Sequence, residues 1–222
     1  MGKRGAGTTG TTGKVLHWAR AYDLLVWVHS LGRERRFRDR LVGLAQLAPG
    51  EFVLDVGSGT GTLAIAAKGR VGAGGRLCGV DPSPEMVARA RRKAAKAGAE
   101  VRFDTAAAEA LPFPDAGFDA VLSTLVLHHL TEDGRRQGIA EIARVTKPGG
   151  RFLAVDLGGG TKGKRHGHLL RLPGHAHFDL DELAPVLDGA GLPVVARGPV
   201  STRELIGLSN LRFVLAARPL LG

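Results

Sequence analysis

The chain has 222 residues, of which 44% are hydrophobic, and a formal net charge of +10. Its length suits one domain with a sizeable core, and its single cysteine, Cys78, excludes an internal disulfide. No stretch approaches the roughly 20 apolar residues of a membrane-spanning helix, and the start lacks an apolar signal core, so we expect a cytoplasmic protein.

The basic residues are unevenly distributed: residues 1–40 hold nine Lys and Arg against three Asp and Glu, and residues 157–178 add four more without an acid. An ordinary solvated surface is the main interpretation, with peripheral contact to an anionic membrane or an acidic substrate as the alternatives. Aromatic residues make up only 5% of the chain and no aromatic-interleaved module occurs, which disfavours a nucleic-acid partner.

The N-terminal region divides into a tail and two helices. Residues 1–13 are rich in Gly and Thr, which predicts disorder, and residues 14–222 are expected to form a single domain. Apolar residues at helical spacing predict helices over 14–30 and 33–47, so that residues 14–48 form a helical cap.

The middle of the chain alternates between strand and helix patterns. Strands are predicted near 52–56, 76–80, 100–104, 119–123 and 151–156, and helices near 62–69, 84–97 and 134–145. Ser83 and Pro84 are suited to the N-cap and first position of the second of these helices. A helix over 180–190 and strands over 194–199 and 211–217 follow. This order predicts a doubly wound α/β sheet that binds ligands at the carboxyl ends of its parallel strands.

Residues 53–61 carry the strongest functional signal, because an apolar run breaks into Gly57, Gly59 and Gly61 just before a helix. Glycines permit tight turns and close approach of a ligand, and the helix start favours an anionic group. Asp81 follows Gly61 by 20 residues, where an acid meets ribose hydroxyls in nucleotide-binding units. The alternatives are a ligand-free turn and a dinucleotide site. The third glycine comes one residue early for the latter, and no Tyr-x-x-x-Lys pair occurs.

Several segments, in order, resemble the motifs of class I S-adenosylmethionine-dependent methyltransferases. They are residues 53–61, 79–83, 108–115, 118–124 and 144–155, the last with a Pro-Gly-Gly turn. The branch that they resemble most contains ubiquinone/menaquinone C-methyltransferases and many small-molecule methyltransferases. The resemblance covers residues 50–156 and implies a Rossmann-like, seven-stranded, mostly parallel sheet closed by an antiparallel hairpin.

The resemblance also implies the roles of cofactor-binding residues. Asp55 would meet the ammonium of S-adenosylmethionine, and Asp81 would accept hydrogen bonds from both ribose hydroxyls. Pro82 and Met86 would cover the adenine, with plain packing as the alternative for Met86. The full predicted set is Asp55, Gly57, Ser58, Gly59, Gly61, Asp81, Pro82, Met86, Ala107, Ala108, Glu109 and Ser123.

One position departs from the family pattern. Related sequences often have an Asp that reaches the adenine amino group where this chain has Ala107. The backbone N–H of Ala108 can still bond the base, so the resemblance implies a site with a weaker adenine contact.

Candidate catalytic residues are few. His128 and His129 follow the fourth predicted strand and could act as a base, because imidazole titrates near neutral pH. The alternative is that they pack or cap the next loop. Tyr22 is a third candidate, since with His29 it could line a lid over the substrate.

Four further histidines, at positions 166, 168, 175 and 177, lie in the Gly-rich insertion 157–178. Short-spaced imidazoles can bind zinc or copper, but the ligand set is incomplete, so we predict no metal site. A loop that covers the substrate is the preferred interpretation.

The sequence thus predicts an S-adenosylmethionine-dependent methyltransferase with a small, apolar or amphipathic acceptor. The alternatives are a methyltransferase-fold scaffold protein without catalysis and an RNA methyltransferase. The sequence does not indicate an oligomeric state.

Overall fold

The computed structural model describes residues 34–158, 179–201 and 210–220. The tail 1–13, the helix predicted over 14–30 and residues 159–178 of the His-rich insertion lie outside these ranges. In the described parts of the chain, no helix is both long and apolar enough to cross a membrane. The single-domain organisation over 14–222 stays a prediction.

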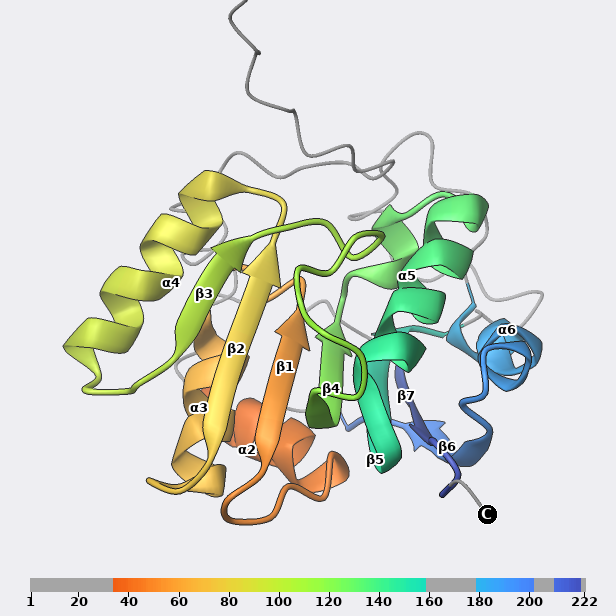
Figure 1. The fold of residues 1–222 in the computed structure, drawn as a ribbon, viewed down its shortest axis with the longest axis horizontal. Helices are drawn as coiled ribbons and strands as arrows, with labels where there is room; N and C mark the ends of the chain where they lie inside the picture. Colours follow the sequence, from red (N-terminus) through yellow and green to blue (C-terminus); the bar gives the residue numbers. More distant parts are fainter. Residues whose placement is uncertain (1–33, 159–178, 202–209, 221–222) are drawn as a thin grey trace, which may run out of the picture.

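A seven-stranded sheet with the order β3-β2-β1-β4-β5-β7-β6 forms the centre of the molecule (Figure 1). All neighbouring strands are parallel except β7, which runs antiparallel to both β5 and β6. The predicted fold class and closing hairpin are therefore confirmed. The strands are β1 (Phe52–Val56), β2 (Arg76–Asp81), β3 (Arg102–Thr105), β4 (Phe118–Thr124), β5 (Thr146–Leu157), β6 (Val194–Pro199) and β7 (Leu211–Ala217).

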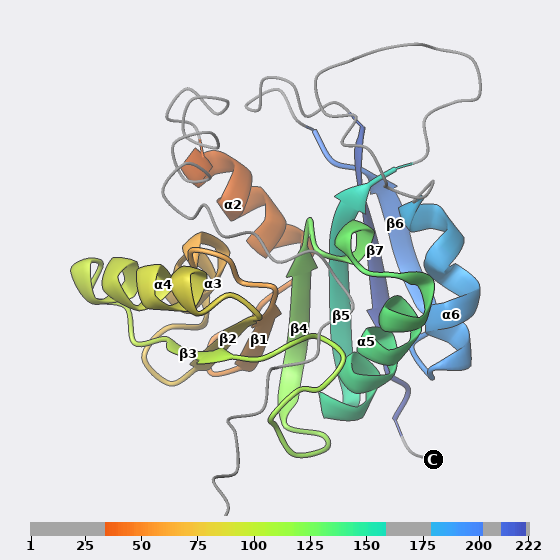
Figure 2. The same cartoon turned by 90° about the horizontal axis from the view of Figure 1, so that it is seen from above.

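Helices cover both faces of the sheet, and each face has its own apolar core (Figure 2). One core joins the sheet to α2 (Glu34–Leu44), α3 (Thr62–Val71) and α4 (Pro84–Lys96). The other joins it to α5 (Glu132–Val145), the 3₁₀ helix η3 (Leu180–Leu183) and α6 (Ala184–Gly189). A third short helix, η1 (Leu127–His129), follows β4.

Polar caps define where two of the helices begin. Ser83 caps α4 as predicted, because its hydroxyl accepts a hydrogen bond from the N–H of Met86 and Pro84 follows. Helix α5 begins at Glu132, two residues before its predicted start. The reason is that the Thr131 hydroxyl accepts a hydrogen bond from the N–H of Gly134.

Two further boundaries differ from the sequence prediction. The segment predicted as one helix over 180–190 is a 3₁₀ turn followed by α6, with Pro185 at the beginning of the α-helical part. Strand β5 begins at Thr146 rather than at 151, because Thr146 already pairs with Phe118 of β4. The register then shifts before Arg151 pairs with Ala120, and the Pro-Gly-Gly turn lies in this irregular part.

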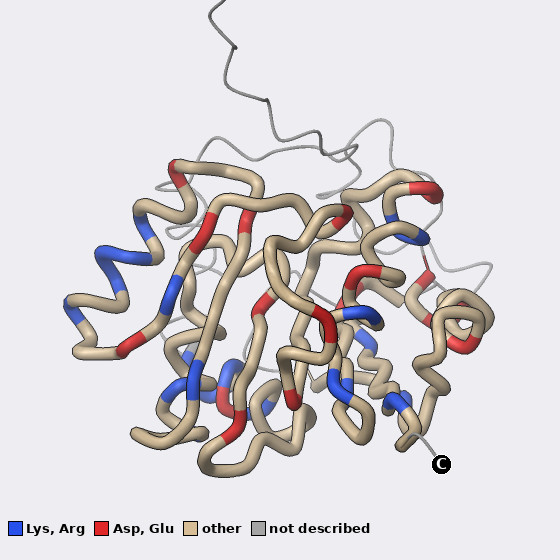
Figure 3. Tube along the Cα trace, viewed as in Figure 1, with Lys and Arg blue, Asp and Glu red and all other residues tan. Residues whose placement is uncertain are grey.

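Helix α4 carries a dense row of basic residues, visible in blue in Figure 3, with Glu85 as its only acid. Not all of these cations are simply solvated. The Arg91 guanidinium donates to the carbonyl of Phe103, and the Lys93 ammonium donates to the hydroxyls of Thr60 and Thr62. Part of the basic charge therefore anchors α4 to β3 and to the loop after β1.

Candidate functional site

The glycine loop, residues 57–61, joins the end of β1 to the start of α3. Gly57 and Ser58 both donate their backbone N–H to the carbonyl of Val80 at 2.8 Å, which ties the loop to the end of β2. Gly57 has a φ of +72°, and a Cβ there would lie 2.2 Å from Cγ2 of Val126. Only glycine fits this position, because the loop packs directly against the segment after β4.

Asp81 connects the two motifs that the sequence separates. Its Oδ2 accepts a hydrogen bond from the N–H of Gly59 and its Oδ1 accepts one from the N–H of Ser83, both at 2.9 Å. Burial raises the pKa of the Asp81 carboxyl, and these two N–H groups oppose that shift. Each oxygen accepts one backbone hydrogen bond, so each retains a lone pair for a ligand hydroxyl.

Gly61, the last residue of the loop, has a packing role. A Cβ at Gly61 would lie 2.7 Å from the Phe103 ring and 2.9 Å from Cβ of Ala90. The glycine therefore allows the start of α3 to approach β3 and α4 closely, which is the role of the third glycine in nucleotide-binding turns.

Asp55 is buried at the carboxyl end of β1, with 2% of its surface exposed. Its Oδ2 has no hydrogen-bond partner among the described residues, and the same is true of the buried hydroxyls of Ser58 and Ser123. Ser123 lies beside β1 because it pairs in register with Val56. Unpaired buried polar groups are costly, and three around one strand end indicate a ligand position.

Burial raises the pKa of the Asp55 carboxyl to about 7. The guanidinium of Arg38 opposes this shift, the negative charge of Asp81 adds to it, and a hydrogen bond from the Ala64 backbone lowers it. A cationic ligand group beside Oδ2 would favour the ionised carboxylate.

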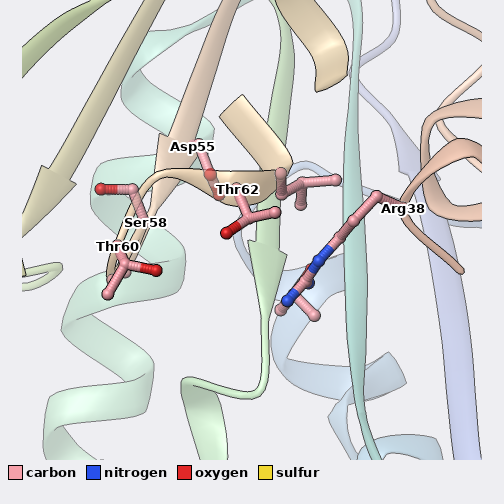
Figure 4. Close-up of a pocket in the computed structure, with 9 residues that line it drawn as sticks. Arg38, Asp55, Ser58, Thr60 and Thr62 are labelled. Carbon is pink, nitrogen blue, oxygen red and sulfur yellow. The ribbon is translucent and has the colours of Figure 1, made fainter. Parts of the chain in front are cut away.

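Arg38, on α2, completes this cavity and was not predicted as a site residue. It lines the same pocket as Asp55, Ser58, Thr60 and Thr62, and Figure 4 shows its side chain across from the loop. The cavity thus presents a carboxylate and a guanidinium, which together suit a zwitterionic amino-acid group. In the sequence Arg38 is one of several arginines near the N-terminus, and only the packing of α2 singles it out.

The remaining predicted cofactor residues gather beside Asp81. The backbone N–H of Ala106 donates to the carbonyl of Asp81 at 3.2 Å, which places the segment after β3 next to the end of β2. Ala107, Ala108 and Met86 are buried, and Pro82 and Glu109 are half-buried. Their contacts with a base stay predictions.

His128 and His129 lie on η1, with ring centroids 3.9 Å apart. Nδ1 of His128 lies 2.6 Å from Oδ1 of Asp156, a residue of β5 that is 1% exposed by its side chain. Asp156 was not predicted as a site residue. Two adjacent parallel strands bring the imidazole and the carboxylate together, and no spacing pattern in the sequence indicates this pair.

Other sequence candidates lie outside the described residues. These are Tyr22 and His29 of the predicted N-terminal helices, and the four histidines of the insertion. Their predicted roles as a lid and as a substrate-covering loop remain predictions.

Comparisons with known proteins find methyltransferases among the relatives of this chain. Residues 53–150 match the methyltransferase domain family. The chain is 41% identical over 136 residues to a demethylmenaquinone methyltransferase of Thermus thermophilus, covering 61% of this chain and 60% of that protein. It is 38% identical over 141 residues to the ubiquinone/menaquinone biosynthesis C-methyltransferase UbiE of Xanthomonas campestris, covering 63% and 55%. The match thus spans little more than half the length of these relatives.

Solved structures share the fold. A SAM-dependent methyltransferase from Aquifex aeolicus is 24% identical with a TM-score of 0.66, and the match covers 82% of this chain and 89% of that one. The [4+2]-cyclase SpnF is 23% identical with a TM-score of 0.71, and the match covers 84% and 81%. The family match and the two relatives confirm the resemblance predicted from the motifs, and the solved structures confirm the fold. A cyclase among the neighbours illustrates that the reaction has to be argued from the site.

Proposed function

We propose that this chain, whose residues 53–150 match the methyltransferase domain family, is an S-adenosylmethionine-dependent methyltransferase for a small, apolar or amphipathic acceptor. The observation that carries the proposal is the cavity at the end of β1. There the buried Asp55 has an oxygen without a hydrogen-bond partner among the described residues, and Arg38 lines the same cavity.

The charges in this cavity fit the methionine part of the cofactor. Asp55 would accept a hydrogen bond from the ammonium, which would favour the ionised form of its carboxyl group. Arg38 would bind the carboxylate of the same group with a charge-assisted hydrogen bond. The unpaired Ser58 hydroxyl adds a neutral donor and acceptor to the same cavity.

The nucleoside would lie along the neighbouring strand end. Asp81 would accept hydrogen bonds from the two ribose hydroxyls with the lone pairs that Gly59 and Ser83 leave available. The segment 106–109 lies beside Asp81 and would adjoin the base. Ala107 provides no side-chain acceptor for an adenine amino group, so backbone groups would make that contact.

S-adenosylmethionine supplies a methyl group on a positively charged sulfur. The residues above would hold the cofactor by its two ends. Positioning of this kind accelerates an in-line displacement, because the reacting atoms need not find each other in solution. The acceptor would approach from the carboxyl ends of β4 and β5, where segment 125–130 lies.

The acceptor class rests on the relatives. The two curated relatives are named as methyltransferases of demethylmenaquinone and of ubiquinone/menaquinone biosynthesis. We therefore propose an apolar, ring-bearing acceptor of the reduced quinone type.

The test combines binding with transfer. Calorimetry with S-adenosylmethionine should give one site per chain, and cofactor with a labelled methyl group should label naphthalene-1,4-diol under reducing conditions. Absence of cofactor binding would contradict the proposal and favour the scaffold alternative. Binding with transfer to RNA but not to the diol would overturn the acceptor class.

A further inference from the structure

His128 and Asp156 form a pair that no cofactor role requires. The two side chains come from η1 and β5, and their facing atoms Nδ1 and Oδ1 are 2.6 Å apart. The pair lies next to the cofactor loop, since Val126, two residues before His128, packs against Gly57.

The Asp156 carboxylate is held in place from several sides. Its Oδ2 accepts hydrogen bonds from the backbone N–H groups of Leu127 and His128, at 2.9 and 3.3 Å. Its Oδ1 accepts one from the N–H of Leu157 at 2.8 Å, in addition to the contact with the imidazole. A carboxylate with this many donors is a fixed acceptor, so it orients the ring that bonds to it.

The hydrogen bond determines which nitrogen of His128 can take a proton. An ionised carboxylate only accepts, so Nδ1 of His128 carries the hydrogen and donates it to Asp156. In the neutral ring Nε2 is then the nitrogen with a lone pair. The arrangement is that of a base with an orienting carboxylate.

Backbone conformation holds this turn in an unusual shape. Leu125, between β4 and η1, has a φ of +58°, which is unfavourable for a branched side chain. The N–H of Leu125 donates to the carbonyl of Val155 at 2.8 Å, so the turn is tied to β5 one residue before Asp156. Strain of this kind often occurs where a structure must place a functional side chain.

We propose that His128 is the general base for an acceptor that must lose a proton during methyl transfer, and that Asp156 is the positioning residue that holds it. This inference rests on the proposed methyltransferase function.

Nε2 of His128 takes the proton of the acceptor hydroxyl, and a new bond forms from the acceptor oxygen or its conjugated ring carbon to the methyl carbon. The bond from that carbon to sulfur breaks and its electron pair stays on sulfur. Where carbon is methylated, its ring proton leaves to water and the proton on Nε2 returns to the acceptor oxygen, which restores the hydroxyl. Where oxygen is methylated, the proton on Nε2 passes to water, so one proton is released in either case.

Titratable and charged groups approach the His128 ring or its turn from η1, β5 and α5. The His129 ring lies against the His128 ring from the same turn, tilted by 42°, and Asp156 faces it from β5. From α5, Arg135 donates to the carbonyls of Leu130 and Leu127 at the two sides of the turn. A pH dependence of methyl transfer therefore has to be distinguished from titration of His129, Asp156 or Arg135.

The experiment measures transfer to naphthalene-1,4-diol and to a simple phenol between pH 5.5 and 9.5, with calorimetry of S-adenosylmethionine in parallel. For wild type, kcat/KM should rise with pH and level off. H128Q should lower kcat/KM at pH 7 by roughly 100-fold or more and recover partly at high pH, where the acceptor ionises unaided. D156N should lower kcat/KM at pH 7 at least about tenfold and shift the pH range over which kcat/KM rises. Both variants should bind cofactor within threefold of wild type, and D133N on the exposed start of α5 should match wild type throughout.

Several outcomes would overturn the inference. The inference fails if kcat/KM of H128Q or D156N depends on pH as that of wild type does and has the same magnitude. It also fails if kcat/KM falls by the same factor at every pH. Nitrogen-15 NMR of the imidazole supplies a readout that needs no acceptor: wild type should be protonated on Nδ1 above neutral pH, and protonation on Nε2 instead would contradict the role. If wild type binds the cofactor but transfers methyl neither to naphthalene-1,4-diol nor to the phenol, the proposal that the acceptor loses a hydroxyl proton would be refuted. Absence of cofactor binding would contradict the proposed function itself.

Discussion

Oδ2 of Asp81 accepts a 2.9 Å hydrogen bond from the backbone N–H of Gly59, so the acid at the end of β2 holds the glycine loop that follows β1. The sequence pattern assigns Asp81 to the ribose alone, whereas the structure adds a role in shaping the loop. The conformation of the glycine loop and the binding of the nucleoside would therefore both depend on the Asp81 carboxylate.

Replacement of Asp81 by Ala should weaken cofactor binding by about 100-fold, because it removes the acceptor for two ribose hydroxyls and releases Gly59. Calorimetry with S-adenosylmethionine measures the change. E85Q, an exposed acid on the first turn of α4, is the matched control and should leave affinity unchanged. Binding by D81A within twofold of wild type would rule out the assignment.

Replacement of Arg38 by Gln should weaken S-adenosylmethionine binding by about 10- to 100-fold, since a charge-assisted hydrogen bond contributes about 1.5–3 kcal/mol. The same variant should bind decarboxylated S-adenosylmethionine no worse than wild type does, because that ligand lacks the group that Arg38 would bind. R36Q, on the exposed side of the same helix, is the control. Equal losses with both ligands would show that Arg38 does not contact the carboxylate.

Asp55 should make the stability of the ligand-free protein depend on pH. Its pKa rises from 3.8 to about 7 on folding, so between these values the folded state holds a proton that the unfolded chain releases. The stability gained from this group is fully present below pH 3.8 and is lost as pH rises through 7. The slope is at most about 1.4 kcal/mol per pH unit.

Urea unfolding of wild type and D55N at pH 5.5, 6.5 and 7.5 measures this dependence. The stability of wild type relative to D55N should fall as pH rises across the series. Parallel pH curves for the two proteins would show that Asp55 stays ionised in the folded state. Cofactor affinity of wild type should change in the opposite direction and increase toward pH 7.5, because the ammonium binds the ionised carboxylate.

Replacement of Gly61 by Ala should destabilise the protein by about 2–4 kcal/mol, since the new Cβ meets Phe103 and Ala90 and the φ of +79° is unfavourable. G43A is the matched control, because Gly43 lies in α2 and a Cβ at this position would have no heavy atom within 4 Å. That change should be neutral or stabilise by up to about 1 kcal/mol. Urea unfolding measures both, and equal stability of G61A and wild type would contradict the packing role.

The order of strands and helices, the glycine loop, Asp81 and the family resemblance could all be predicted from the sequence. These depend on local patterns: apolar runs, helix caps, and glycines beside a strand end. Its errors at the start of α5 and at β5 arose where a cap and an irregular strand pairing shifted a boundary by a few residues.

The contacts between side chains that are distant in the chain could not be predicted from the sequence, because they arise from the packing of the elements. Arg38 reaches the cavity of Asp55 because α2 packs on α3, and Asp156 meets His128 because β4 and β5 are neighbours in the sheet. Partners of this kind are far apart in the chain and share no spacing rule. Whether two such charged side chains come into contact depends on how the helices and strands pack. A local pattern of residues does not carry this information.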